Sequence, residues 1–273
     1  MPRAPTAGRV SIVGAGPGAA DLLTLRALDR IREADAVLHD ALIDRAVLDL
    51  LPTGAATIPV GRRRGREIMA QDAINRRMLE LARAGRRVVR LKGGDPMIFG
   101  RGAEEVEFLS RHGVAVEIVP GVTAALGAAA AFGFGLTHRA HASAVVFVTA
   151  QAVADGGPDG IDWRALARER QTVVVYMGGT RPATVAARLI EGGLSPETPA
   201  AAIRDASRPN QAMALGTLAT LPRTTARVAG PGPTLIVVGA VLRTLAAVAE
   251  EAAPNGCYLP RQSLPRVDRN GVP

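Results

Sequence analysis

The amino-acid sequence predicts an α/β protein built from two α/β domains, and three observations lead to this prediction. Apolar strand-like runs alternate with helical patterns from Val10 to Val241. Glycine turns directly follow several of these runs, and a glycine-rich polar segment from Phe132 to Ser143 separates two sets of elements. The 273 residues, 48% of them hydrophobic, are enough to bury a large core.

The first set of elements predicts parallel strands joined by helical crossovers. Leu22, Leu25, Leu28 and Ile31 recur at helical spacing and predict the first helix. The remaining helices of this half are expected at 46–51, 74–85 and 103–111, and after 121. Apolar runs predict strands at 10–13, 36–39, 57–60, 87–91 and 114–119.

The second set of elements has the same mixed character. Strands are predicted at 145–149, 173–177, 200–203, 212–215 and 235–238, and helices near 164–168, 183–191 and 241–251. The last segment is rich in Pro, Arg and Asn and has little periodicity, which is typical of a poorly ordered tail. The predicted organisation is an N-terminal tail, an N-terminal α/β domain, a C-terminal α/β domain and a flexible tail, over 1–9, 10–138, 139–251 and 252–273.

Cysteine usage and hydropathy indicate a cytoplasmic protein. Cys257 is the single cysteine, so an intrachain disulfide is impossible and a reducing compartment is expected. The first nine residues have no apolar run of a signal peptide. The most apolar segment, Gly121 to Leu136, is shorter than the ~20 residues of a membrane span, so we expect no membrane partner.

Basic residues are concentrated between Gly61 and Arg101. This segment holds twelve basic and four acidic residues, and the whole chain has a net charge of +8. Of its 33 basic residues only Lys92 is a lysine. The charge favours an anionic partner, either a nucleic acid or a small polycarboxylate or polyphosphate; a solvated basic surface is the alternative. Because aromatics make up only 3% of the chain and no binding motif is present, we expect no nucleic-acid partner.

The first glycine turn, VGAGPGA at 13–19, follows a strand and precedes a helix, as a dinucleotide fingerprint does. Asp40 ends the next strand, where an acid could meet a ribose, so a nicotinamide-dependent oxidoreductase is one hypothesis. Pro17 argues against it, because proline removes an N–H from a turn that must donate to a pyrophosphate. A turn that lets the backbone approach another ligand fits better, and a purely structural turn is the alternative.

The second glycine turn lies in RLKGGDPMIFGRGAEE, at 90–105, and also follows a strand. Ligands bind at the carboxyl ends of strands in open α/β sheets. Gly93 and Gly94 expose backbone, and Asp95 supplies a carboxylate, which suits a ribose hydroxyl or a cationic group. The P-loop pattern is absent. The alternative is a sharp turn in which Asp95 accepts from a nearby backbone N–H.

Eight motifs in order resemble those of the uroporphyrinogen-III C-methyltransferases, a branch of the tetrapyrrole methylases that acts in sirohaem and cobalamin synthesis. They are VGAGPGAADLLTL, ADAVLHDALI, VGRRRG, RLKGGDPMIFGRGAEE, VPGVTAAL, LTHR, VVVYMG and PTLIVVG. The resemblance covers about Val10 to Val241. It implies two α/β domains with the cofactor in the cleft between them, a homodimer, and methylation of uroporphyrinogen III at C-2 and C-7 to give precorrin-2 through precorrin-1.

The resemblance also implies a set of cofactor contacts. S-adenosylmethionine, which leaves as S-adenosylhomocysteine, would bind at Pro17, Gly93, Gly94, Asp95, Ile98, Thr123, Ala124, Met177 and Ala206. Ala206 stands where many relatives carry glycine. Most of these residues offer backbone or small apolar side chains. No metal is implied, and the four histidines show no ligand spacing with Cys257.

Further residues match the family's catalytic and substrate positions. Asp40 matches the proton acceptor, with a helix N-cap as the alternative. Arg62 stands at the proton donor, a lysine in the family; because arginine is effectively never deprotonated, a carboxylate contact suits it better. Arg101 and Glu104 would contact the tetrapyrrole polycarboxylate, and Arg101 could assist proton removal; for Glu104 the alternative is a first-turn helix acid. The junction residues Thr137, His138 and Arg139 are further substrate candidates, with His138 as a hinge residue the alternative.

Two departures from the family motifs lie beside these positions. GAEE replaces the commoner GGEE, and GFGLTHR replaces the commoner GIPLTHR. The role of Lys92 is not implied by the resemblance.

Overall fold

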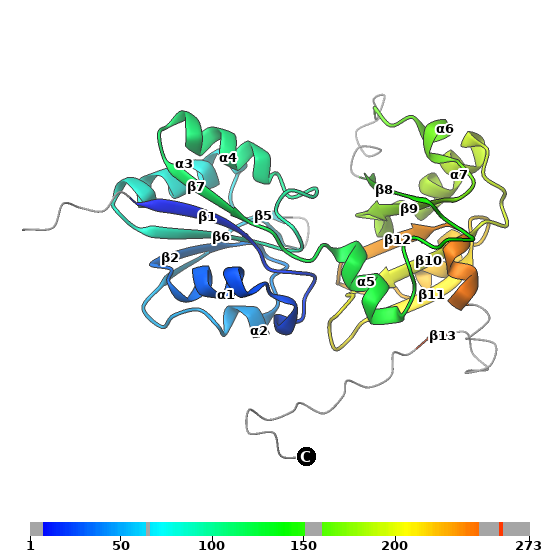
Figure 1. Cartoon of the computed structure of the whole chain (residues 1–273), viewed down its shortest axis with the longest axis horizontal. Coiled ribbons are helices and arrows are strands. Elements are labelled where there is room, and N and C mark those ends of the chain that lie inside the picture. Colours follow the sequence, from blue (N-terminus) through cyan, green and yellow to red (C-terminus); the bar gives the residue numbers. More distant parts are fainter. Residues whose placement is uncertain (1–7, 64–65, 151–159, 246–256, 259–273) are drawn as a thin grey trace, which may run out of the picture.

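Two β-sheets with helices packed against them organise the chain (Figure 1). The structure, a computed structural model, describes residues 8–63, 66–150, 160–245 and 257–258. The two sheets lie in separate halves of the molecule, which confirms the predicted class of two α/β domains. Among the residues that are described, no helix is long and apolar enough to cross a membrane.

The first sheet contains five parallel strands in the order β3-β2-β6-β1-β7. This confirms the parallel arrangement that the alternating pattern predicted. The strands are β1 Arg9–Gly14, β2 Ala36–His39, β3 Ala56–Pro59, β6 Arg87–Lys92 and β7 Ala115–Val119. The helices are η1 Ala20–Leu22, α1 Leu25–Arg32, α2 Arg45–Leu48, α3 Gln71–Arg83 and α4 Gly102–Arg111. A short hairpin of β4 Arg62–Arg63 and β5 Arg66–Glu67 precedes α3.

Helices cover both faces of this sheet, so its strands are apolar on both sides. Val13, Val89 and Leu91 pack beneath α1 and α2, whereas Val10 and Val88 pack beneath α3 and α4 on the opposite face (Figure 1). Because side chains alternate along a strand, Arg90 and Lys92 of β6 follow Val88 on the face that α3 and α4 cover, where apolar residues would be expected.

The second sheet has six strands in the order β13-β11-β10-β12-β9-β8. Only β8 and β9 are parallel, and the other pairs are antiparallel. The strands are β8 Ala144–Thr149, β9 Gln171–Tyr176, β10 Pro199–Arg204, β11 Ala212–Thr217, β12 Thr234–Val238 and β13 Cys257–Tyr258. The helices are α5 Ala124–Phe132, α6 Trp163–Leu166, η3 Gly178–Thr180, α7 Pro182–Gly192, α8 Leu221–Ala226 and η4 Ala240–Leu242.

Packing places α5 with the second domain. Ala125, Ala128 and Phe132 are fully buried in one cluster with β9, β10 and β12 residues. The change from one core to the other therefore falls in the loop between β7 and α5, earlier in the chain than the predicted boundary between 138 and 139. Most of the predicted tail at 252–273 and residues 1–7 of the N-terminal tail lie outside the described residues; 257–258 pair with β11.

An ion pair between Asp35 and Arg87 joins the amino ends of β2 and β6, and a first testable prediction concerns this pair. Asp35 accepts hydrogen bonds from the backbone and guanidinium N–H groups of Arg87, and these bonds lower the pKa of Asp35 from 3.8 to about 2. A carboxyl group whose pKa is lowered by folding stabilises the folded state at pH values above its ordinary pKa. This stabilisation is lost as the pH falls through the lowered pKa of the folded state. We expect Asp35→Asn to lower the free energy of unfolding by about 1 kcal/mol at pH 7.

Urea denaturation at pH 7 and near pH 2 checks this prediction, because the difference between variant and wild type should shrink across that interval. Asp49→Asn is the matched control, since Asp49 pairs with the exposed side chain of Arg45 one helical turn away. The control should change stability by no more than a few tenths of a kcal/mol. A loss for Asp35→Asn that is the same at both pH values would contradict the assignment.

Candidate active site

A cavity of about 830 Å³ lies between the two domains and is lined by residues of both. The first domain contributes the turns after β1, β6 and β7, so the cavity lies at the carboxyl edge of the parallel sheet, where open α/β sheets bind ligands. The second domain contributes the ends of β9 and β10 and the segment from 229 to 235. All nine predicted cofactor residues line it: Pro17, Gly93, Gly94, Asp95, Ile98, Thr123, Ala124, Met177 and Ala206.

The floor of the cavity is formed by backbone of the glycine turns. Gly16 and Gly94 exchange two backbone hydrogen bonds, of 3.2 and 2.8 Å, and both have positive φ angles. A Cβ atom on Gly121 would lie 2.3 Å from the carbonyl oxygen of Gly94 and 2.9 Å from Gly14 Cα. A side chain at Gly121 would therefore separate the turns.

These pairings also decide what the first turn can bind. The N–H groups of Ala15 and Gly16 donate to the carbonyl oxygens of Lys92 and Gly94, and Pro17 has no N–H. The Ala19 N–H donates to Ser207 Oγ of the second domain. The turn thus lacks the row of free donors that a dinucleotide pyrophosphate needs, and the oxidoreductase hypothesis loses its main support.

Asp95 ties two of the turns together. Its Oδ1 accepts from the Met97 N–H at 2.8 Å, and its Oδ2 accepts from the Gly121 N–H at 3.1 Å. The first bond is the local turn that was the alternative interpretation of Asp95, and the second reaches the loop after β7. Asp95 therefore both lines the cavity and holds its floor in shape.

An aromatic group that the motifs did not identify forms another wall. The Tyr176 hydroxyl accepts from the Ala125 N–H at 3.2 Å and lies 2.6 Å from Thr123 Oγ1. Burial raises the pKa of Tyr176, against the opposing effect of these two bonds. Its ring contacts those of Phe99 and Phe147, with centroids 5.0 and 5.6 Å away. The chain has only eight aromatic residues, and these three are among them. This scarcity is the one sequence feature that could have drawn attention to them.

Unusual backbone conformations also gather at this cavity. Phe99 and Met177 line it with φ angles of 50° and 57°. Asp205 and Ser207, with φ angles of 50° and 65°, stand on either side of the lining residue Ala206. Non-glycine residues adopt such angles at a cost of about 1–3 kcal/mol and cluster at functional sites.

Arg208, a further lining residue that the motifs missed, connects the two domains. Its guanidinium donates to the carbonyl oxygen of Leu42 and lies 3.9 Å from the Asp44 carboxylate, both in the first domain. It also lies 3.6 Å from the Asp205 carboxylate of its own domain. The side chain thus bridges the two sides of the cavity.

Asp40 follows β2, two residues before the lining residue Leu42. Its Oδ1 accepts from Arg90 Nη2 at 2.5 Å, and the side chain is 29% exposed. The alternative of a helix N-cap is wrong, because Asp44 holds that position and accepts from the Ala46 N–H. Asp40 is therefore a partly exposed carboxylate with a buried cationic partner.

Of the other predicted catalytic and substrate residues of the first domain, Arg101 is next in sequence to a residue that lines the cavity. Arg101 follows the lining residue Gly100 and pairs with Glu104 at 2.6 Å, and both side chains are more than half exposed. Arg101 lowers the pKa of Glu104, which occupies the first turn of α4. The backbone of Arg62 forms β4, and its side chain lies outside the part that the structure describes.

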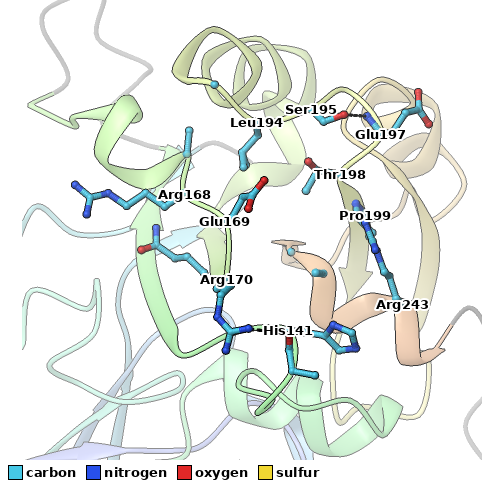
Figure 2. Close-up of a pocket in the computed structure, with 16 residues that line it drawn as sticks. His141, Arg168, Glu169, Arg170, Leu194, Ser195, Glu197, Thr198, Pro199 and Arg243 are labelled. Atoms are coloured by element: carbon cyan, nitrogen blue, oxygen red, sulfur yellow. Dashed lines mark hydrogen bonds between the residues drawn. The ribbon is translucent and has the colours of Figure 1, made fainter.

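Thr137, His138 and Arg139 do not line the interdomain cavity in this chain. They precede a second cavity of about 450 Å³, lined by His141, Arg170 and Gln171 among others (Figure 2). Arg170 donates to the carbonyl oxygen of Arg139, and His138 stacks on His141.

The two cavities lie at opposite ends of β9, because Gln171 begins that strand and Tyr176 ends it. A strand of this length separates them by about 17 Å. A role for Thr137, His138 and Arg139 in substrate binding stays a prediction. Among the described residues, no group of three or more His, Cys, Asp or Glu side chains is placed to hold a metal ion.

The fold and site define a two-domain α/β protein with a glycine-floored small-molecule site in its interdomain cleft. Comparison with known proteins specifies the class further. The family model for Tetrapyrrole (Corrin/Porphyrin) Methylases matches residues 9–222. The chain therefore belongs to the tetrapyrrole methylases.

Two sets of relatives are informative. Siroheme synthases of Neisseria meningitidis serogroup B and Pseudomonas fluorescens are 52% and 48% identical over 86% and 87% of this chain. The chain spans about half the length of these curated relatives, 48% and 51%. Among solved structures, uroporphyrin-III C-methyl transferase of Thermus thermophilus, complexed with S-adenyl homocysteine, is 41% identical with a TM-score of 0.73, over 86% of this chain and 99% of that one. A cobalt precorrin-4 methyltransferase is 28% identical with a TM-score of 0.78, over 89% and 98% of the two chains.

Proposed function

We propose that this chain is a uroporphyrinogen-III C-methyltransferase. In this proposal it transfers methyl groups from S-adenosylmethionine to C-2 and C-7 of uroporphyrinogen III, gives precorrin-2 through precorrin-1, and releases S-adenosylhomocysteine. The observation that carries the proposal is the convergence of all nine predicted cofactor residues, which come from both domains, on one cavity. The Thermus relative, which spans the same two domains, supports the assignment of both the substrate class and the cofactor.

The lining suits this cofactor physically. Its floor is bare backbone, and a Cβ atom on Gly93 would meet no atom within 4 Å, so the cavity is open at that point. When bound, S-adenosylmethionine supplies an electrophilic methyl group. The protein then contributes placement of the substrate and a base, for which Asp40 is the candidate. The basic segment around Arg101 suits an octacarboxylate, because guanidinium groups bind carboxylates well.

Assembly and location follow the resemblance. We propose a homodimer in the cytoplasm. In a homodimer, residues that lie away from the cavity of one chain, such as Thr137, His138 and Arg139, are candidates for contacts with a second copy. Light scattering should give twice the mass of one chain, whereas a mass of 28.3 kDa would contradict the dimer.

Product masses test the substrate assignment. The protein is incubated anaerobically with S-adenosylmethionine and either uroporphyrinogen III or precorrin-2. We expect two methyl groups to be added to uroporphyrinogen III and none to precorrin-2. Methylation of precorrin-2 alone would show a later methylase of the same family.

Asp95→Ala should weaken S-adenosylhomocysteine binding by about tenfold, because the turn loses acceptors for the Met97 and Gly121 N–H groups. Titration calorimetry measures this effect. Asp72→Ala is the control, since Asp72 is a first-turn residue of α3 that does not line the cavity. Unchanged affinity in Asp95→Ala would count against this site.

A further inference from the structure

Four charged side chains are gathered on one face of the first sheet, beneath α3 and α4. Arg90 and Lys92 are two residues apart on β6 and point to this face, where α4 contributes Glu105. Asp40 follows the end of β2, the strand beside β6. Leu38 of β2 pairs with Arg90 of β6. The two acids and two bases balance in charge. Arg90, Lys92 and Glu105 have side chains no more than 3% exposed, so only Asp40 reaches toward solvent.

The guanidinium of Arg90 is held on three acceptors. Nε donates to Glu105 Oε1 at 3.0 Å, Nη1 donates to the Leu91 carbonyl oxygen at 3.3 Å, and Nη2 donates to Asp40 Oδ1 at 2.5 Å. A planar fork with these contacts has little freedom to rotate. It fixes one oxygen of Asp40, and within the described part of the chain the other oxygen, Oδ2, has no hydrogen-bond partner.

Lys92 completes the balance around Glu105. Its Nζ donates to Glu105 Oε1 at 3.0 Å, and Gln71 Nε2 donates to the same oxygen at 3.1 Å. Burial lowers the pKa of Lys92 and Arg90 lowers it further, while Glu105 acts in the opposite direction. A Cβ atom on Gly100 would lie 3.2 Å from Lys92 Cε, so the space is narrow. A slim ammonium side chain suits this place better than a guanidinium, although the chain otherwise uses only arginine.

We infer that Arg90 is a positioning residue for the methyl-transfer reaction, which holds the carboxylate of Asp40 so that Oδ2 faces the substrate. The inference rests on the proposed function. In this arrangement Arg90 Nε, Lys92 and Gln71 all donate to Glu105 Oε1, whereas the Nη2 arm of the Arg90 fork donates to Asp40. Among the described residues, Glu105 Oε2 has no hydrogen-bond partner. Arg90 itself does not line the cavity and acts through Asp40 alone.

A double-mutant cycle separates this role from a structural one. Arg90→Met leaves Glu105 paired with Lys92 and Asp40 partly solvated, so no carboxylate is left buried without a partner. We expect Arg90→Met to lower kcat with uroporphyrinogen III by about 10- to 100-fold, with KM for S-adenosylmethionine unchanged. In the Asp40→Asn background the same change should lower kcat by less than about twofold, because residues that act as one unit are not additive.

Arg87→Met is the matched control, because it breaks another Arg–Asp pair at the far end of the same strand. Its kcat should equal that of wild type. If Arg90→Met does not fold, Arg90→Lys takes its place in the cycle, since it keeps the charge but loses the fork; it should still lower kcat in the wild-type background only. Equal losses of kcat in both backgrounds, or no loss in the wild-type background, would overturn the inference. Absence of methyl transfer by the wild-type protein would instead refute the proposed function.

Discussion

Asp40→Asn should lower kcat for methylation of uroporphyrinogen III by at least ~100-fold, because general-base catalysis contributes about 10²- to 10⁴-fold. Asparagine keeps the size of the side chain and an acceptor for Arg90, but it cannot take a proton. S-adenosylhomocysteine affinity should not change, because Asp40 does not line the cavity. Anaerobic rates with methyl-labelled S-adenosylmethionine and calorimetry with S-adenosylhomocysteine measure the two quantities.

Asp44→Ala is the control for a general effect on this loop. Asp44 caps α2 and lies four residues from Asp40. Its loss should cost about 1 kcal/mol of stability with little change in kcat. Full activity of Asp40→Asn would remove Asp40 from the reaction, and a parallel loss of S-adenosylhomocysteine affinity would indicate a structural rather than a chemical role.

Gly121→Ala should abolish measurable S-adenosylhomocysteine binding and lower the free energy of unfolding by about 3 kcal/mol. The added Cβ atom would overlap the Gly94 carbonyl oxygen at 2.3 Å and backbone atoms of Gly14 at 2.9 Å. Because these are backbone atoms, no side chain can rotate away, and the glycine turns must separate. Urea denaturation and calorimetry measure the two effects.

Gly93→Ala separates ligand binding from stability at the same floor. The new methyl group would meet no protein atom within 4 Å, and Gly93 lines the cavity. We expect wild-type stability but weaker S-adenosylhomocysteine binding, because the methyl group occupies ligand space. Gly54→Ala, which also meets nothing within 4 Å but lies in an exposed loop, should change neither quantity. A stable Gly121→Ala variant would contradict the close packing of the turns.

Local sequence patterns predicted the longer strands, because most of these are short apolar runs between turn residues, but they did not predict the two-residue strands β4, β5 and β13. The parallel sheet followed from alternation with helices, and the five main strands of the second sheet were also predicted within a few residues. The cofactor residues followed from the resemblance, and their convergence depends on a simple topological rule. Loops after parallel strands meet at one edge of the sheet.

Other features depend on packing between distant segments, which no local pattern reports. α5 is apolar on all sides, with six alanines among its nine residues, so its sequence does not indicate which domain buries it. Tyr176 becomes part of the site because α5 brings Thr123 to its hydroxyl. The sequence did not indicate a role for Lys92, because its partner Glu105 lies on α4, a helix that packs against the sheet.

The most direct measurement is an anaerobic assay of the wild-type protein with uroporphyrinogen III and S-adenosylmethionine, followed by absorption. If the interdomain cavity is a methyl-transfer site, the dimethylated dipyrrocorphin chromophore of precorrin-2 appears only when both compounds are present, and added S-adenosylhomocysteine suppresses it. Intact S-adenosylmethionine and an unchanged tetrapyrrole spectrum would contradict the proposed function.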